Sequence, residues 1–402
     1  MKNQYTEEEL IDHLQYWLFN IGRNASNLSV LCQLLMDEFS ELEIQIDRLN
    51  VGIFVMHPEL AGIAYQLTPD ETYPTAITIN HSSLESPIYL DSPIRKVVEG
   101  KVALRWRLTS DDALELPFLL ELQAQGFTEY MSLPLLGTHN RVHVLSLATK
   151  HPNGFYDDVY HALCTFSHTL AMLTDSLTTQ QLADVLLQLY VGRKTGPRVL
   201  EGEVNLGEGR TIRAAMLYSD MRGFSQMCNE IGAAPTINVL NQYLSIVCSV
   251  IQEEGGEILK FMGDAIMAIF PVEISPGSAA YQRLLDTSAA DSCLRAARKS
   301  NERIIEWTEQ NPELPIRAGF GLSLGEVFYG NIGAPGRLDF TVIGDAVNLA
   351  ARLETLCKTY ERDILIGPNF QGACHSPMHR LGKQEIKGFP DPLPIYSIRN
   401  RE

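Results

Sequence analysis

Two stretches in the second half of the chain decide its fold. Residues 214–225 read AAMLYSDMRGFS, and residues 257–270 read EILKFMGDAIMAIF. In each stretch an apolar run of strand character ends at an aspartate, Asp220 or Asp264, with a glycine close by. The second stretch predicts a tight hairpin, because Gly263 and Asp264 lie between two apolar runs and glycine tolerates the backbone of a tight turn.

The segment between these stretches predicts a helix. Apolar residues recur at helical spacing within residues 235–254, at Ile237, Leu240, Leu244, Val247 and Ile251. A strand, a helix and a hairpin in this order can set the hairpin beside the first strand, so we expect Asp220 and Asp264 to converge. Converging carboxylates supply the hard oxygen ligands that a pair of Mg²⁺ ions needs. Taken alone, an aspartate near a glycine at a strand end is more often a turn residue.

Further residues accompany the two aspartates in a specific pattern. Phe224 follows Gly223, and Lys260 lies four residues before Asp264. With these residues and a later helix, residues 191–398 resemble the class III nucleotidyl cyclases, the family of adenylate and guanylate cyclases. The resemblance implies an α+β catalytic domain of the ferredoxin-like, palm-type fold.

The later helix carries two polar residues on one face. Residues 338–353 read LDFTVIGDAVNLAARL, which predicts a strand that turns into a helix with Asn348 and Arg352 at i and i+4. Such a pair is usually a surface pair, but here it resembles the family pattern Asn-x-x-x-Arg. The resemblance implies that the pair orients the ribose and stabilises charge on the reacting phosphate. Lys387 resembles the family's phosphate-binding lysine, although a lysine in a loop before a terminal strand is ordinarily solvated.

The resemblance implies a specific reaction. The ribose 3′-hydroxyl of ATP would attack the α-phosphorus in line with departing pyrophosphate and form 3′,5′-cyclic AMP. Two Mg²⁺ or Mn²⁺ ions per active site would be held by Asp220 and Asp264. Backbone amides near Gly223 and Phe224 could hold phosphates where the first strand turns into a helix.

The resemblance also implies a homodimer. In the family, the metal-binding aspartates come from one subunit and the Asn/Arg pair from its partner. Asp220, Asp264, Asn348 and Arg352 all lie on this one chain. A homodimer with two equivalent active sites at the subunit interface is therefore expected.

Base choice depends on Lys260 and Thr341. Adenine offers an acceptor at N1 and an amino donor, whereas guanine offers the opposite polarity. Lysine only donates and a threonine hydroxyl can accept, which matches adenine. Family guanylate cyclases typically carry glutamate at the position of Lys260, and many adenylate cyclases carry aspartate where this chain has Thr341. The sequence favours an adenylate cyclase, with a guanylate cyclase or a catalytically silent nucleotide-binding signalling module as alternatives.

Length and composition predict two domains and a connector. The chain has 402 residues, which favours more than one core, and we divide it at residues 1–154, 155–209 and 210–402. A net charge of −17 argues against binding to nucleic acid or to an anionic membrane surface.

Seven scattered cysteines without CxxC pairs predict reduced thiols rather than disulfides or a zinc site. No run approaches 18 uninterrupted apolar residues and the first ten residues are acidic, so we expect a soluble, cytoplasmic protein.

The N-terminal half predicts an α+β regulatory domain. It has helical patterns at residues 7–20, 28–42, 92–99 and 117–125, and strand patterns at residues 46–55, 62–67, 76–80, 102–108, 130–136 and 142–149. This order predicts an antiparallel sheet of five or six strands and resembles a GAF domain, a fold that often holds a small ligand. Neither the histidines nor Cys32 forms a ligand signature, so the ligand, the trigger and the sign of regulation stay open.

The connector reads as one long helix over residues 156–190. Apolar residues there form a seam with steps of three and four, at Leu163, Phe166, Leu170, Leu173 and Leu177. The seam loses phase across residues 178–181 and resumes at Leu182, Leu186 and Leu189. A parallel dimer connector between sensor and catalytic domain is preferred, and a helix packed on its own domain is the alternative.

Overall fold

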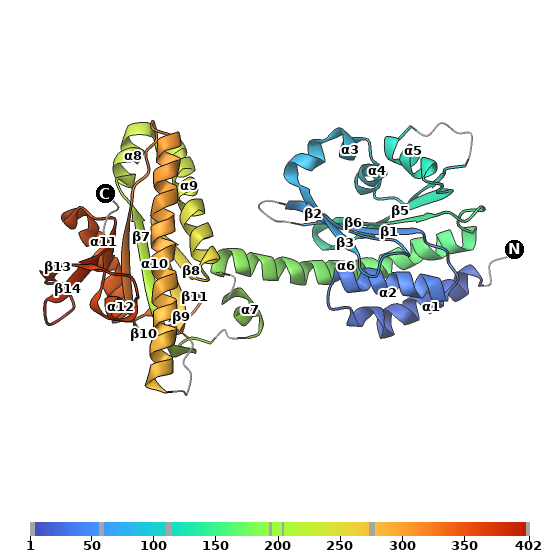
Figure 1. Cartoon of the computed structure of the whole chain (residues 1–402). Helices are drawn as coiled ribbons and strands as arrows, with labels where there is room; N and C mark the ends of the chain where they lie inside the picture. The colour runs from blue at the N-terminus through green and yellow to red at the C-terminus, as the bar shows by residue number, and fades with distance from the viewer. Residues whose placement is uncertain are drawn as a thin grey trace. The chain divides into compact units, whose positions relative to one another are not determined.

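The chain folds into two compact units. The computed structural model describes residues 5–55, 60–109, 115–192, 195–202, 205–272 and 278–398. The units are Met1–Leu186 and Leu187–Glu402, and each is built around its own sheet (Figure 1).

The first unit has a six-stranded sheet in the order β3-β2-β1-β6-β5-β4. Every neighbouring pair in it is antiparallel, so the predicted antiparallel sheet is confirmed. The strands are β1 (Arg48–Phe54), β2 (Leu60–Leu67), β3 (Thr75–Asn80), β4 (Leu104–Arg107), β5 (Glu129–Leu136) and β6 (Val142–Thr149).

Helices cover both faces of this sheet (Figure 1). One face is covered by α1 (Glu7–Asn20), α2 (Leu28–Glu41) and the first part of α6 (Asp157–Val191). Over the other face lie α3 (Pro87–Leu90), α4 (Pro93–Gly100) and α5 (Pro117–Ala124). The four longer helices of this half that the sequence predicts, and α6, are confirmed to within two residues at each end, whereas the short α3 was not anticipated. Three 3₁₀ turns complete the unit, at Gly22–Asn24, His81–Glu85 and Thr138–Asn140.

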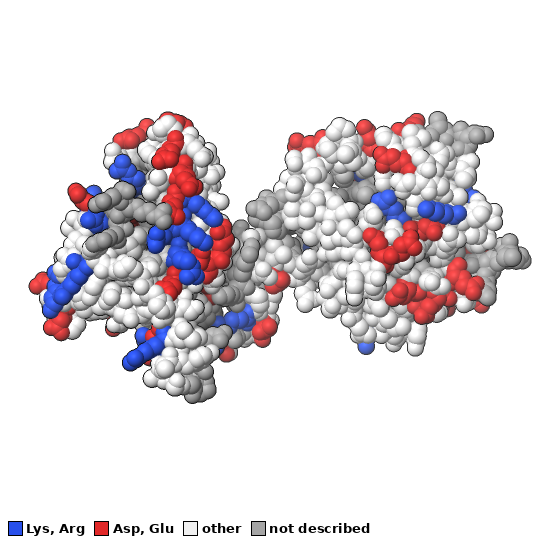
Figure 2. Space-filling view, viewed as in Figure 1, with Lys and Arg blue, Asp and Glu red and all other residues white. Residues whose placement is uncertain are grey.

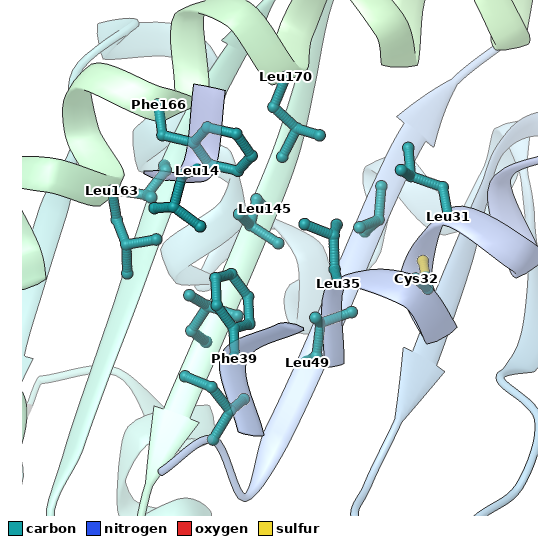
Figure 3. Close-up of a cluster of buried hydrophobic side chains, with 14 of the residues drawn as sticks. Leu14, Leu31, Cys32, Leu35, Phe39, Leu49, Leu145, Leu163, Phe166 and Leu170 are labelled. Carbon is teal, nitrogen blue, oxygen red and sulfur yellow. The ribbon is translucent and has the colours of Figure 1, made fainter. Parts of the chain in front are cut away.

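The main core of the first unit lies between the sheet and α1, α2 and α6. Figure 3 shows Leu14, Phe39, Leu145 and Phe166 in this cluster. The first seam residues of α6 point into it: Leu163, Phe166 and Leu170 are fully buried. That half of the seam therefore packs on its own domain, as the alternative interpretation proposed, because the sheet presents an apolar face that must be covered. The helix is continuous through residues 178–181, and Leu189 near its end is 52% exposed.

The second unit has an eight-stranded sheet in the order β13-β14-β12-β10-β7-β9-β8, with β11 paired to β10. Its strands are β7 (Gly209–Met221), β8 (Glu257–Met262), β9 (Ala265–Val272), β10 (Ala318–Ala334), β11 (Arg337–Ile343), β12 (Ile364–Ile366), β13 (His379–Gln384) and β14 (Leu393–Ser397). Its helices are α7 (Thr195–Leu200), α8 (Phe224–Ile231), α9 (Ala233–Glu253), α10 (Ala279–Gln310), α11 (Asp345–Tyr360) and α12 (Pro368–Ala373).

The predicted strand, helix and hairpin of the second unit are confirmed. They appear as β7, α9 and the β8–β9 hairpin, whose turn has Gly263 at φ 68°. Within the described residues, α9 is the one helix long and apolar enough to cross a membrane by length and composition. Tyr243, Val247 and Ile251 on one face of α9 are fully buried in the core that it shares with α10 and the sheet, which is the packing of a core helix.

Two glycines of β10 let α11 lie directly on the sheet. A Cβ atom at Gly321 would collide with the backbone carbonyl of Ala350, and one at Gly319 with the side chain of Glu354. Gly319 pairs with Asp220 across β7 and β10. The close approach therefore brings α11 to the end of β7 where Asp220 lies.

The surface carries both signs of charge. On the face that Figure 2 shows, Lys and Arg side chains lie among Asp and Glu side chains in both units. On the helices of the second unit these form ion pairs, such as Arg303 with Glu253 and Arg295 with Glu254, each at 2.8 Å. All seven cysteines are free.

Candidate active site

The centre of the site is the carboxylate pair of Asp220 and Asp264. Asp220 lies near the end of β7, and Asp264 lies in the turn between β8 and β9. The pairing of Ser219 with Ile266 aligns β9 with β7, so the turn meets the end of β7. Burial, and then the like charge of Asp264, raise the pKa of Asp220 to about 6. The convergence expected from the sequence is therefore present in the structure.

A third carboxylate, Glu354 on α11, lies beside this pair. Its side chain is mostly buried, and burial followed by the charge of Asp220 raises its pKa to about 7, while Arg222 opposes the rise. Sequence reasoning did not find Glu354. The available signal was Gly319, the strand partner of Asp220, because a glycine there leaves space for a side chain from the helix above.

Arg222 holds the strand end next to the carboxylates. Its guanidinium donates to the carbonyl oxygen of Arg362 at 2.6 Å and lies 3.3 Å from the carboxylate of Asp363. Its backbone N–H donates to the carbonyl of Arg317 at 2.8 Å. These contacts fix the backbone directly after Asp220.

The carboxylate pair fits divalent cations. Asp220 Oδ1 is buried and has no hydrogen-bond partner among the described residues, which is costly unless a cation or a donor approaches it. Oxygen is the preferred ligand of Mg²⁺. No group of three or more His, Cys, Asp or Glu side chains in the described part of the chain is arranged around one metal position. Asp220 and Asp264 would therefore need waters or substrate phosphates to complete a coordination shell.

Asn348 and Arg352 lie apart from the carboxylates of their own chain. Both are exposed and one turn apart on α11, on the side away from buried Leu353 and Glu354. Among the described residues neither side chain has a hydrogen bond or an ion pair to Asp220 or Asp264. Within the part of the chain that the structure describes, no hydrogen bond or ion pair thus joins the two expected halves of the site within one chain.

The expected base-binding residues, Lys260 and Thr341, lie on β8 and β11. The Lys260 ammonium donates to Asp339 Oδ2 at 2.9 Å. Thr341 is buried, and its hydroxyl has no hydrogen-bond partner among the described residues. Asp339 lies two residues before Thr341 on the same face of β11. Sequence reasoning missed Asp339, although this spacing was the signal that placed it beside Thr341.

The remaining predicted residues lie at two exposed turns. Gly223 precedes α8 with φ 80°, and apart from its chain neighbours no atom lies within 4 Å of a Cβ built on it. The first amides of a helix have no acceptor within the helix. Phe224 begins that helix and packs partly on the core. Lys387 is exposed in the turn between β13 and β14.

A cavity of about 790 Å³ opens beside Lys260. One wall is the end of α6, residues 188–192, and the other walls come from β8 and from residues 338–340 of β11. Lys260 and Asp339 both line it. The last turn of the connector helix therefore borders the residues expected to bind the base.

Comparisons with known proteins point to one family. Residues 208–397 match the model of the adenylate and guanylate cyclase catalytic domain. The chain is 32% identical to an adenylate cyclase of Anabaena cylindrica over 49% of this chain and 38% of that protein. It is 34% identical to a terminal-differentiation specific adenylate cyclase of Dictyostelium discoideum over 40% of this chain and 7% of that protein. The chain thus spans well under half the length of these relatives. A crystal structure of the adenylyl cyclase CyaB from P. aeruginosa is similar over 48% of this chain and 97% of that one, with 26% identity and a TM-score of 0.42.

The carboxylate cluster predicts how stability depends on pH. Because the pKa of Asp220 is raised from 3.8 to about 6, the folded state binds more protons than the unfolded state between these values. The stability of the metal-free protein should therefore fall as pH rises through this window. Asp220→Asn removes this effect and should stabilise the metal-free protein by about 1 kcal/mol at pH values above 6, after allowance for solvent screening of a half-buried group.

The measurement is urea unfolding in EDTA at an acidic and a mildly alkaline pH. Asp391→Asn, which changes an exposed aspartate of the same unit, is the matched control and should change nothing. If Asp220→Asn is no more stable than the wild type at the alkaline pH, the ionised Asp220 does not destabilise the metal-free protein.

Proposed function

We propose that this chain, in which residues 208–397 form an adenylate and guanylate cyclase catalytic domain, converts ATP into 3′,5′-cyclic AMP and pyrophosphate. The observation that carries the proposal is the convergence of Asp220 and Asp264, with an unpartnered Asp220 oxygen, inside that domain. Adenylate cyclases of two organisms at 32% and 34% identity support the choice of ATP. The alternatives are a guanylate cyclase and a silent nucleotide-binding module.

The reaction forms a bond between the ribose 3′-oxygen and the α-phosphorus and breaks the bond from that phosphorus to pyrophosphate. Asp220 and Asp264 would hold two Mg²⁺ or Mn²⁺ ions per site, which when bound acidify the 3′-hydroxyl and neutralise phosphate charge. The amides at the start of α8, by Gly223 and Phe224, which have no acceptor within the helix, would donate to phosphate oxygens. Lys387 would add positive charge to the pyrophosphate end.

The other half of the site would come from a second copy of the chain. Arg352 would stabilise charge on the α-phosphate in the transition state, and Asn348 would orient the ribose. Both side chains are exposed and without partners among the described residues of their own chain, which supports a role across a subunit interface. A homodimer would then have two equivalent active sites.

Three residues would select adenine. Lys260 would donate to adenine N1, and the unpartnered hydroxyl of Thr341 would accept from the amino group. Without substrate, Lys260 is held by Asp339 at 2.9 Å. The base must therefore share the lysine with Asp339 or displace it, so Asp339 would set how strongly Lys260 binds the base.

The first unit would regulate the second. Its antiparallel sheet between helices is consistent with a GAF-like sensor, residues 1–154, joined through a connector, residues 155–209, to the catalytic domain, residues 210–402. Residues 188–192 of the connector helix line the cavity that contains Lys260. A shift of that helix end would therefore change the shape of the cavity beside Lys260. The net charge of −17 argues against binding to nucleic acid or to an anionic membrane surface, and the seven free cysteines support a cytoplasmic location.

Turnover of ATP tests the proposed function. The wild-type chain with Mn²⁺ should make cyclic AMP and pyrophosphate. Asp264→Ala should abolish turnover while the protein stays folded, because one of the two carboxylates of the metal site is lost. Asp391→Ala is the exposed control in the same domain. Cyclic AMP production by Asp264→Ala at near the wild-type rate would contradict the assignment.

Lys260→Glu tests base choice. Glutamate would offer an acceptor to guanine N1–H and would leave adenine N1 without its donor. A stranded buried polar group costs about 1–3 kcal/mol, or about 5- to 150-fold in turnover. We expect kcat/KM for ATP to fall by that factor and the preference over GTP to narrow. An unchanged ratio of kcat/KM for ATP and GTP would show that Lys260 does not contact the base.

A further inference from the structure

One face of the sheet of the first unit packs on the main core, and the other face carries a row of polar side chains beside a smaller apolar cluster. On β1, Leu49, Val51 and Ile53 point into the main core, so Arg48 and Asn50 point to the opposite face. In an antiparallel sheet a polar face normally meets solvent. Here α4 and α5 cover the second face (Figure 1), so its polar side chains lie beneath helices.

The polar side chains form a row across four strands. Ser132 on β5 pairs with Ser146 on β6, Ser146 pairs with Asn50 on β1, and Asn50 pairs with Gln66 on β2. Ser132 and Ser146 are buried and hydrogen-bonded to each other at 3.1 Å. Arg48 lies in the next row and donates to Gln66 at 2.7 Å. A row of this kind lowers stability unless its groups are paired.

A cavity of about 80 Å³ lies over this row. Seven residues line it: Arg48, Asn50, Ile94, Phe118, Tyr130, Ser146 and Ala148. Phe118 forms an apolar wall, and the Arg48 guanidinium lies 5.3 Å from the centre of its ring. A buried water needs about 10–15 Å³ of such volume, so the cavity has room for about six water-sized groups.

Two groups at the cavity lack partners that their chemistry requires. The Asn50 Oδ1 atom is buried without a hydrogen-bond partner among the described residues. Arg48 has no carboxylate within ion-pair distance in the described ranges, and its hydrogen-bond acceptor is the neutral Gln66. Burial lowers the pKa of Arg48, and Tyr130 and the carboxylate of Glu121, which is beyond ion-pair distance, oppose the fall.

We propose that this cavity binds a small organic anion, a carboxylate that also carries a hydroxyl or amino group. The carboxylate would bind Arg48, which is suited to planar, bidentate recognition of such groups. The hydroxyl or amino group would donate to Asn50 Oδ1. Tyr130 and Ser146 hydroxyls would complete the polar contacts, and Phe118 and Ile94 would contact the carbon atoms.

Size narrows the class of ligand further. A nucleotide is several times larger than a cavity of about 80 Å³, so neither ATP nor cyclic AMP fits. A carboxylate with two to four carbon atoms fits. The ligand of this cavity therefore differs from the nucleotides proposed for the second unit. Its binding does not depend on whether the chain makes cyclic AMP.

Calorimetric titration of the full chain with glycolate, L-lactate and L-serine tests the proposal. At least one of these should bind saturably with one site per chain, and lactamide, which lacks the charge, should not bind. Arg48→Gln should weaken the binding tenfold or more, because it removes a charge-assisted contact. Arg23→Gln, which changes an exposed arginine of the same unit, should leave binding unchanged.

Ser146→Ala provides a second variant in case Arg48→Gln does not fold, and it should weaken binding severalfold. Three results would overturn the proposal. The first is no saturable binding of any of the three carboxylates. The second is binding that both Arg48→Gln and Ser146→Ala leave unchanged. The third is inorganic phosphate binding with the same dependence on Arg48 while the carboxylates do not bind, which would assign the site to phosphate.

Discussion

The second unit depends on the close approach of like charges at the end of β7. Asp220, Asp264 and Glu354 lie together there, and burial and mutual repulsion raise the pKa of Asp220 to about 6 and of Glu354 to about 7. Natural folds keep such a cluster where function requires it. Without a cation, the cluster lowers the free energy of unfolding. A cation that binds only the folded state would raise it again.

The packing of α11 near this cluster decides which side of that helix faces solvent. Because Gly319 and Gly321 let α11 lie directly on β10, one side of the helix is sealed against the sheet and buries Glu354. The opposite side then presents Asn348 and Arg352 to solvent. One helix therefore buries Glu354 beside the carboxylates of its own chain and leaves an amide and a guanidinium exposed on its other side.

Much of this could be predicted from the sequence, for physical reasons. The β7 strand, the α9 helix and the β8–β9 hairpin followed from apolar periodicity and from Gly263. The same pattern placed Asp220 next to Asp264, whereas their binding of metal stays a prediction. Glu354 was missed because its position depends on the packing of α11 on β10, and the contact of Asp339 with Lys260 was missed because it joins two strands far apart in sequence. The preferred dimer interpretation of the α6 seam was wrong for its first half, which packs on its own domain. An apolar stripe can pack on its own sheet as well as on a second helix.

The central claim is that two copies of the chain build each active site, and a mixing experiment tests it most directly. Asp220→Ala and Arg352→Ala should each be inactive alone, because each lacks one half of every site. Mixed under conditions that exchange subunits, they should recover activity, since the mixed dimer has one intact site. Cyclic AMP formation restored by mixing is the predicted result. No activity in a mixture with verified subunit exchange would contradict the account and assign each site to a single chain.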